Sequence, residues 1–376
     1  MSSLLRRAIL LATTACALLA ASVAQAATTP VGPGISKEPA PNPTVTAGAS
    51  TTFSVTATGT PTLKYQWQFK SGATFSNITG ATKSTYTITK VAPANAGTYR
   101  VIVSNAVGSC ASFPASVLTV NPNFAGKYNV ASIDYVPTDV MNGITPNNGN
   151  GSGGADYGTA TITGTGPYSL SVTQKIYLGS DSGVTETLSG SVSAQGLFII
   201  SSPDSSPFVN MLTASDGTPI GFLGTSTPKN GNTHDSFILG LNTATTAPSS
   251  IAACVGNYTL IVIAYNATAV SKKNSAQNGG DGQIGTLTVS SGGAVKISFK
   301  RYATLGNTLG ETQNLTGSVS ASGVLTITGK SKVSVKFVAL NGQVIGFQGT
   351  AAPVPNTDQN DTVILIGLKN TSVKPL

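Results

Sequence analysis

The chain has 376 residues, enough for two or three domains. Charged residues make up 9% of it and apolar residues 40%, whereas charged residues make up about 25% of an average soluble protein. The apolar share is sufficient for packed cores, so the composition argues against global disorder. The low charge, together with abundant Gly, Ser, Thr and Asn, favours all-β structure.

The first 26 residues have the pattern of a signal peptide. Arg6 and Arg7 supply positive charge, an alanine-rich apolar stretch covers 8–21, and Ala-Gln-Ala at 24–26 fits a small-x-small cleavage site. The apolar stretch is too short for a convincing membrane span. We therefore expect a secreted protein with no transmembrane span in the mature chain, located outside the cell or at its surface, with the periplasm as the alternative.

Residues 27–45 are rich in proline and predict an extended leader. From 46 to 121, short runs of alternating apolar and polar residues predict antiparallel strands. These runs include Tyr-Gln-Trp, which ends at Trp67, and Asn-Ala-Gly-Thr-Tyr-Arg-Val, which contains Tyr99. The two motifs resemble those of an immunoglobulin-like domain of the intermediate-set type, in the disulfide-free form found in secreted bacterial proteins.

The resemblance implies a β-sandwich with Trp67 in the core of one strand and Tyr99 at the tyrosine corner. The two cysteine positions of the family fall on Val55 and Val101. We therefore expect these valines to pack against Trp67 in place of a disulfide. Such a module indicates a binding or spacer role without naming a ligand.

An internal repeat follows the short linker at 121–123. Three motifs recur in the same order at nearly constant spacing: Gly-x-Tyr at 126–128 and 256–258, Leu-x-Gly-Ser-Val-Ser-Ala-x-Gly at 188–196 and 315–323, and Ile-Gly-Phe-x-Gly-Thr at 220–225 and 345–350. The final strands, 235–242 and 361–368, are also alike. This arrangement indicates a duplication.

We predict two β-repeat units at 124–243 and 254–370, joined by a linker at 244–253. Each unit contains seven or eight strand candidates, so its sheet must either close or fold into two layers. The predicted fold class is all-β: an Ig-like β-sandwich followed by two duplicated antiparallel β-meander domains, barrel-like or sandwich, with the barrel favoured. We expect the two units to fold separately.

Two cysteines remain after the signal peptide, Cys110 and Cys254. Secretion would permit a disulfide between them. The predicted separation of their strands favours two isolated buried thiols, and both alternatives stay open.

The chain offers few groups for acid–base or nucleophilic catalysis. His234 stands beside Asp235, but the second copy has Asp361 at the matching place and no histidine near it. No Gly-x-Ser-x-Gly nucleophile motif is present. The acids fall mainly in predicted turns, where aspartate serves backbone geometry: Asp134, Asp156, Asp181, Asp204, Asp216, Asp281 and Asp358. We therefore predict a non-enzymatic protein without a cofactor, and keep a hydrolase as the weakest alternative.

Two further features have some properties of binding sites. Gly/Asn-rich loops at 147–156 and 278–282 resemble calcium loops in oxygen content, but each has one carboxylate, and calcium prefers six to eight oxygen ligands. A mobile loop is therefore favoured over a calcium site. Several tyrosines would suit a sugar-stacking platform and equally suit β-cores: Tyr135, Tyr157, Tyr177, Tyr265 and Tyr302.

The net charge differs between the predicted domains: +5 for the Ig-like region, −5 for the first repeat unit and +6 from residue 254 onward. Two strands of the second unit, predicted at 295–301 and 330–338, alternate lysine with apolar residues, which places each set of lysines on one face. These lysines are Lys296, Lys300, Lys330, Lys332 and Lys336. They predict either a solvated surface or contact with an anionic partner, which would be an acidic polysaccharide or the acidic first unit of another molecule.

Together these features predict a secreted, non-enzymatic binding protein for extracellular adhesion or surface recognition. Its expected partner is an extracellular protein or polysaccharide surface, and not a nucleic acid. The alternative is an accessory module that binds carbohydrate or a small ligand in its β-units.

Overall fold

The computed structural model describes most of the chain from residue 29 onward, including most of the predicted leader at 27–45, where strands form at Gly34–Lys37 and Thr44–Thr46. The described residues are 29–70, 72–135, 154–178, 183–200, 205–214, 217–228, 235–266, 280–304, 312–328, 333–340, 342–351 and 361–370. The predicted signal peptide at 1–26 lies outside them. They form β-strands almost throughout, with one short α-helix, α3 (Ile251–Cys254), and one 3-10 turn, η1 (Pro93–Asn95). The all-β prediction is confirmed, and no described helix is long and apolar enough to cross a membrane.

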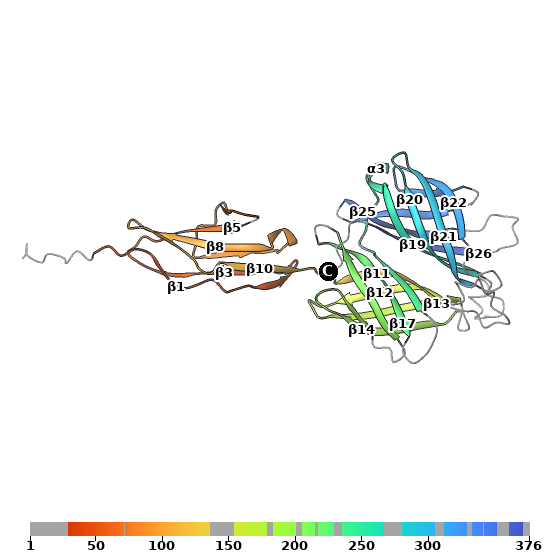
Figure 1. Ribbon diagram of the computed structural model, residues 1–376, viewed down its shortest axis with the longest axis horizontal. Coiled ribbons are helices and arrows are strands. Elements are labelled where there is room, and N and C mark those ends of the chain that lie inside the picture. The colour runs from red at the N-terminus through yellow and green to blue at the C-terminus, as the bar shows by residue number, and fades with distance from the viewer. Residues whose placement is uncertain are drawn as a thin grey trace, which may run out of the picture. The chain divides into compact units, whose positions relative to one another are not determined.

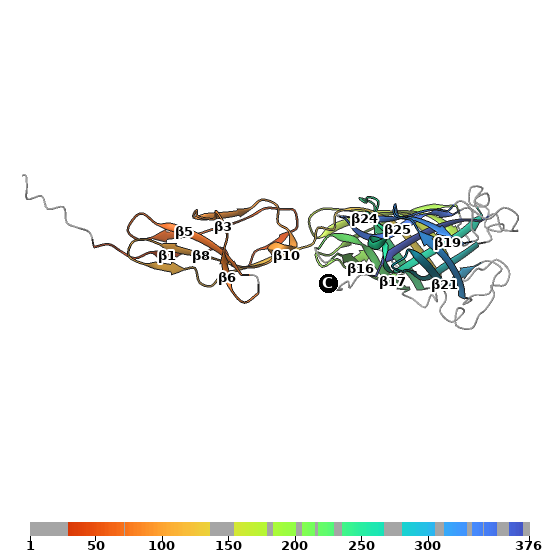
Figure 2. The ribbon, with the colours of Figure 1, turned by 90° about the horizontal axis from the view of Figure 1, so that it is seen from above.

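The N-terminal strands build an Ig-like β-sandwich (Figure 1). Its strands are β1 (Gly34–Lys37), β2 (Thr44–Thr46), β3 (Thr51–Ser54), β4 (Thr56–Thr58), β5 (Lys64–Lys70), β6 (Phe75–Asn77), β7 (Thr85–Ile88), β8 (Gly97–Ser104), β9 (Ser109–Ala111) and β10 (Ser116–Asn121). One sheet has the order β2-β10-β8-β5-β6 with β9 on β8, and the pairs β1-β4 and β3-β7 complete the domain. β3 and β5 therefore belong to different sheets, and Figure 2 shows the domain turned by 90°.

Aromatic side chains fill the space between these sheets. Trp67 is fully buried, and its backbone pairs directly with that of Val101 on β8. The Phe53 ring lies 5.9 Å from Trp67 and 4.7 Å from Tyr99, measured between ring centroids. The indole N–H donates to the carbonyl of Lys83 at 2.9 Å, so the one polar atom of the ring is satisfied. The four residues expected in the Ig-like core are all buried: Val55, Trp67, Tyr99 and Val101.

The repeat region forms two eight-stranded meanders. The first barrel consists of β11 (Gly126–Tyr135), β12 (Ala155–Thr163), β13 (Tyr168–Leu178), β14 (Thr185–Val192), β15 (Phe198–Ile200), β16 (Ser205–Thr213), β17 (Pro219–Pro228) and β18 (Asp235–Asn242). The second barrel consists of β19 (Gly256–Asn266), β20 (Gly280–Val289), β21 (Ala294–Thr304), β22 (Thr312–Val319), β23 (Val324–Ile327), β24 (Val333–Leu340), β25 (Gln343–Ala351) and β26 (Asp361–Lys369).

Both meanders are barrel-like, as the sequence favoured. The second is a closed barrel in chain order, with β26 pairing back onto β19. In the first, β11 pairs with β18, and the ends of the sheet meet where the Met211 N–H donates to the Gly196 carbonyl at 2.8 Å. The second barrel makes the equivalent bond from the Phe337 N–H to the Gly323 carbonyl at 2.7 Å. The duplicated sequence therefore gives one topology twice.

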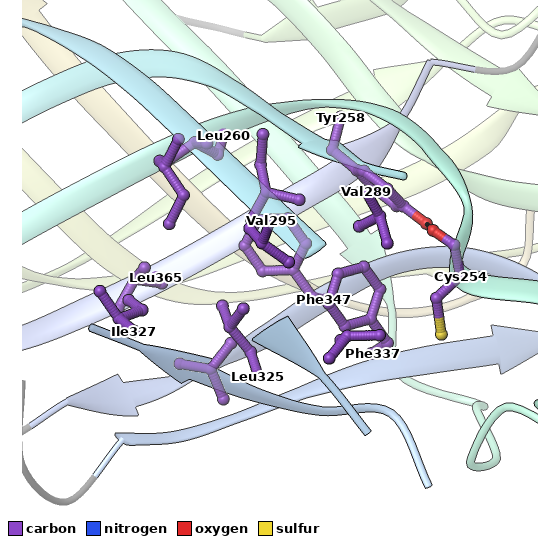
Figure 3. Packing of buried hydrophobic residues seen from close by; sticks show 14 of the residues in the cluster. Cys254, Tyr258, Leu260, Val289, Val295, Leu325, Ile327, Phe337, Phe347 and Leu365 are labelled. Carbon is purple, nitrogen blue, oxygen red and sulfur yellow. Dashed lines mark hydrogen bonds between the residues drawn. The ribbon is translucent and has the colours of Figure 1, made fainter. Parts of the chain in front are cut away.

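The recurring Gly-x-Tyr motif places a buried tyrosine at the same point of each barrel. Tyr128 donates its hydroxyl hydrogen to the carbonyl of Phe124 at 2.8 Å, and Tyr258 donates to that of Cys254 at 2.5 Å. Figure 3 shows the hydroxyl of Tyr258 reaching the backbone of Cys254, with Phe337 and Phe347 nearby. A hydrogen bond is needed here because both tyrosines have no exposed surface.

Each barrel also pairs a phenylalanine with a glycine on the next strand. Phe222 lies opposite Gly240, and Phe347 lies opposite Gly367. A Cβ on either glycine would come within 2.2 Å of the phenylalanine ring, so only glycine fits. When Gly240 is aligned with Gly367, Asp235 on β18 corresponds to Thr362 on β26. The sequence comparison placed Asp361 there, one residue earlier. The expectation for Asp361 was therefore wrong.

Besides the two barrel interiors, a separate hydrophobic cluster joins the outer walls of the two barrels, which belong to one compact unit. It contains five matched pairs from corresponding strands: Ala131 and Ile261, Ile133 and Ile263, Ile220 and Ile345, Leu239 and Ile366, and Leu241 and Leu368. Because each barrel uses β11, β17 and β18 or their equivalents β19, β25 and β26, the contact resembles the isologous interface of a two-fold symmetric dimer. One hydrogen bond breaks the symmetry: Asn129 donates to Gln348 at 2.5 Å.

Neither described cysteine is in a disulfide. Cys254 is buried and Cys110, on β9, is half-buried. The expectation of two unpaired thiols agrees with this arrangement, although Cys110 is less enclosed than expected because it lies on a short strand that pairs only with β8.

Candidate functional site

Lysines and hydroxyl groups cover the outer face of strands β21–β24 in the second barrel, which we call the basic wall. Lys296 on β21 and Lys336 on β24 are exposed, and Lys300 on β21 is half-buried. The residues that alternate with the β21 lysines point inward into the barrel core: Val295, Ile297 and Phe299. Lys330 and Lys332 lie outside the described residues.

The structure does not place the two lysine sets on neighbouring strands. β22 and β23 lie between β21 and β24. Exposed Asn314, Thr316, Ser318 and Thr326 lie on them, and exposed Thr328 follows β23 directly. Lys296 lies directly opposite Thr316. Along the described residues of these four strands there is no carboxylate, so the basic wall combines cations with neutral hydroxyl groups.

The matching wall of the first barrel has less positive charge. The strand register aligns Ser171 with Lys296 and Lys175 with Lys300. Asn210 takes the place of Lys336, since Met211 and Phe337 make the equivalent closing bonds. The duplicated scaffold therefore accepts neutral residues at two of these positions, and the basic wall is a property of the second barrel alone.

A polar network lines the interior of the first barrel toward one end. Asp156 is 7% exposed, and its Oδ2 accepts from the Ser132 hydroxyl at 3.2 Å and from Gln174 Nε2 at 3.3 Å. The same Gln174 nitrogen donates to Glu186 Oε1 at 2.6 Å. These side chains follow the inward phase of their strands, because Tyr128 lies four residues before Ser132 on β11 and points into the core.

Asp156 is in an unfavourable environment for a negative charge. Burial is the main cause that raises its pKa well above the ordinary value, and the nearby carboxylates of Asp134 and Glu186 raise it further. The hydrogen bond from Ser132 acts in the opposite direction. The group therefore favours the protonated state at higher pH than a surface carboxyl does.

The second barrel replaces two of the four side chains of this polar network with apolar ones. Val262 takes the place of Ser132, Phe299 that of Gln174, and Gln283 that of Asp156. Val262 and Phe299 belong to the hydrophobic core of that barrel. The interior polarity of the first barrel is therefore not a requirement of the fold.

The placement of the acids in turns was wrong for three of them. Asp134 lies on β11. Asp156 and Asp281 lie on β12 and β20, because these strands begin inside the Gly/Asn-rich segments at 147–156 and 278–282. The remaining four lie outside the described residues, as does His234. Among the residues that the structure describes, no group of three or more potential ligands could hold a metal ion.

The tyrosines considered for sugar stacking do not form a described platform. Tyr157 and Tyr177 pack at the edge of the cluster between the barrels, and burial raises the pKa of both. The side chains of Tyr135, Tyr265 and Tyr302 lie outside the described part.

One family model matches the N-terminal domain. A family model described as "Immunoglobulin domain" matches residues 33–105. These residues form an immunoglobulin-like domain. The match therefore confirms the resemblance that Trp67 and Tyr99 indicated. It is limited to this segment of the chain.

A segment of the chain is also similar to Endoglucanase C of Cellulomonas fimi. The two are 34% identical over 83 residues, which is 22% of this chain and 7% of that enzyme. The chain thus spans a small part of the relative. Two solved structures are also similar. A chimeric titin Z1Z2 is 20% identical over 25% of this chain and 97% of that chain, with a TM-score of 0.20. A Dpr2 Ig1-Ig2 complex with DIP-Theta Ig1-Ig3 is 13% identical over 76% of this chain and 64% of that chain, with a TM-score of 0.22.

Proposed function

We propose that this is a secreted, non-enzymatic binding protein that attaches to an anionic surface outside the cell through the basic wall. The observation that carries the proposal is the combination of Lys296, Lys300 and Lys336 with neutral hydroxyl groups on four strands without a described carboxylate. Such a surface attracts polyanions over the range of the screening length, about 8–10 Å at physiological salt.

An anionic polysaccharide is the partner that we favour. The likeness of a segment of this chain to part of an endoglucanase supports a polysaccharide, because that name belongs to a protein that acts on a polysaccharide. The preference for an anionic one rests on the lysines of the basic wall. Serine, threonine and asparagine side chains between the lysines also suit sugar hydroxyl groups, to which they can both donate and accept. Adhesion to an extracellular protein is the alternative partner class.

The same likeness favours a second candidate, an accessory module for neutral carbohydrate. This candidate differs in its dependence on charge. A neutral glucan would bind with little sensitivity to salt, whereas binding to a polyanion through exposed lysines weakens strongly as salt is added.

Retention of the secreted chain on an immobilised acidic polysaccharide tests the proposal. The variant replaces Lys296, Lys300, Lys332 and Lys336 with Gln. The matched control replaces four exposed lysines of the Ig-like domain with Gln: Lys37, Lys64, Lys83 and Lys90. We expect retention of the parent and of the control to weaken steeply between low and physiological salt, and retention of the wall variant to be weaker than both at low salt.

Equal retention of the wall variant and the parent would show that the basic wall is only solvated surface. Retention on neutral glucan at all salt concentrations, unchanged in the wall variant, would support the accessory-module candidate instead. Circular dichroism and melting of each variant establish that the fold is retained.

A further inference from the structure

The outer face of the larger Ig-like sheet carries a continuous row of polar side chains across three strands. Arg100 on β8 lies opposite Gln68 on β5, and Gln68 lies opposite Asn77 on β6. Arg100 Nε donates to Gln68 Oε1 at 2.7 Å, and Gln68 Nε2 donates to Asn77 Oδ1 at 2.8 Å. Adjacent strands are about 4.8 Å apart, so the row extends about 10 Å.

A phenylalanine holds the guanidinium in place. The Cζ atom of Arg100 lies 4.0 Å from the centroid of the Phe75 ring, and Lys70 Nζ lies 5.8 Å from the same centroid. Both distances are within the range of cation–π attraction. With Nε bonded to Gln68 and Cζ over the Phe75 ring, the guanidinium of Arg100 is held from two directions.

Two cations therefore share one aromatic ring in a domain that is poor in acids. The only acidic residue in the described part of the domain, 29–70 and 72–121, is Glu38, and its Oε2 accepts from the Phe113 N–H at 3.2 Å. Among the described residues, Nε is the one guanidinium nitrogen of Arg100 with a hydrogen-bonding partner. The forked pair of terminal nitrogens remains for an external acceptor.

We propose that this row, formed by Arg100, Lys70, Gln68, Asn77 and Phe75, is a binding site for uronic acid residues of an anionic polysaccharide. A guanidinium fork matches the two oxygens of a carboxylate in a planar, bidentate pair. Lys70 supplies a second, less directional positive charge. Phe75 acts as a positioning residue for the guanidinium.

The neutral end of the row distinguishes a sugar acid from a simple anion. Asn77 is exposed, and with its Oδ1 occupied by Gln68 its amide N–H groups can donate outward. A uronic acid carries hydroxyl acceptors beside its carboxylate, and two linked sugar rings span a distance comparable to the row. An acidic peptide presents the carboxylate without those hydroxyl groups, so the row fits a sugar acid better.

The site goes beyond the proposed function, because it lies in the Ig-like domain and shares no residue with the basic wall. Calorimetric titration of the full secreted chain with hexagalacturonate tests it, and cellohexaose and hexaglutamate are the neutral and peptide controls. We expect the uronate to bind and both controls to bind far more weakly. The variant with Gln at 296, 300, 332 and 336 should retain this binding, so failure of one proposal is distinguishable from failure of the other.

Substitutions in the row identify the residues responsible. Arg100→Lys keeps the charge but removes the fork, and we expect it to weaken uronate binding by about tenfold or more. Asn77→Ala removes an exposed donor with little effect on the fold, and it should also weaken binding. Lys83→Gln removes one exposed charge elsewhere in the domain and should change the affinity by less than about twofold.

The proposal is overturned if Asn77→Ala and Arg100→Lys both bind the uronate as the parent does. It is also overturned if the parent does not bind hexagalacturonate. Binding of hexaglutamate as tight as that of the uronate would reassign the row to acidic peptides and overturn the sugar assignment. If Arg100→Lys lowers the melting temperature, Asn77→Ala alone decides the result.

Discussion

Gly346 of the second barrel faces Leu241 of the first, and a Cβ on Gly346 would lie 2.8 Å from Leu241 Cδ1. The matching contact is present on the other side of the interface, where a Cβ on Gly221 would lie 3.1 Å from Leu368 Cδ1. The glycine of each repeated Ile-Gly-Phe motif therefore provides space for the final leucine of the other barrel. This reciprocal arrangement makes the barrel contact part of the packed interior of the protein.

The first prediction is that the barrel interface contributes strongly to stability. Leu368→Ala removes a side chain that is 2% exposed and leaves a cavity beside Gly221, so we expect a loss of about 2–5 kcal/mol in the free energy of unfolding. Ile199→Ala is the matched control, because Ile199 is 54% exposed and its truncation should change stability by about 0.5 kcal/mol or less. Denaturant titration measures both, and equal losses would contradict the interface.

The second prediction concerns the second barrel alone. A chain covering 254–370 would expose the face of Ile261, Ile263, Ile345, Ile366 and Leu368, which the first barrel covers in the full protein. In the intact molecule this face packs against the matching face of the first barrel, which has the same topology. We therefore expect two copies of the isolated barrel to pair through it as dimers. Sedimentation measures the mass, and Leu368→Lys should shift it to the monomer. A folded monomer without any substitution would show that the barrels are independent.

The third prediction is that packing alone holds the Ig-like core. Trp67→Ala should cost about 3–5 kcal/mol and unfold this domain, because the ring is fully buried against Phe53 and opposite Val101. Reductant should leave the melting of the domain unchanged, since Cys110 is a free cysteine. A lower melting temperature of this domain in reductant would contradict the prediction.

The fourth prediction is a pH dependence of the first barrel. Burial raises the pKa of Asp156, and Asp134 and Glu186 add to it, so the folded state binds the proton more tightly than the unfolded chain does. The contribution to stability is therefore present below the ordinary carboxyl pKa of about 3.9 and is lost as pH rises through the higher folded value. Asp156→Asn should melt at a higher temperature than the parent at neutral pH and remove this slope. A variant with the slope of the parent would assign it to other groups.

Strand periodicity predicted much of the architecture. Alternation at Val295, Ile297 and Phe299 indicated which side of β21 faces the core, and the repeated motifs indicated two copies of one meander. The barrel interface gave no such signal, because β19 and β26 are buried on both faces and have continuous apolar runs. Such runs are typical of strands covered on both sides, and they do not state what covers them.

The polar networks were harder to predict. Asp156 could have been assigned to the barrel interior only by extending β12 into a Gly/Asn-rich segment, since the phase of a strand is meaningful only once its start is known. Arg100 and Phe75 are separated by 25 residues and lie on strands that do not pair with each other. Their contact depends on β5 standing between them, which the spacing in the sequence does not reveal.

Fusing the two barrels into one chain removes a restriction that a symmetric homodimer would face. In a homodimer every substitution occurs in both subunits, so a change that suits one half is imposed on the other. Here Asn129 and Gln348 bond across the interface, while the corresponding positions are Thr259 and Leu223. The same independence allows one half to become acidic with a polar interior while the other becomes basic with a more apolar one. Covalent linkage thus allows specialisation without loss of the shared interface.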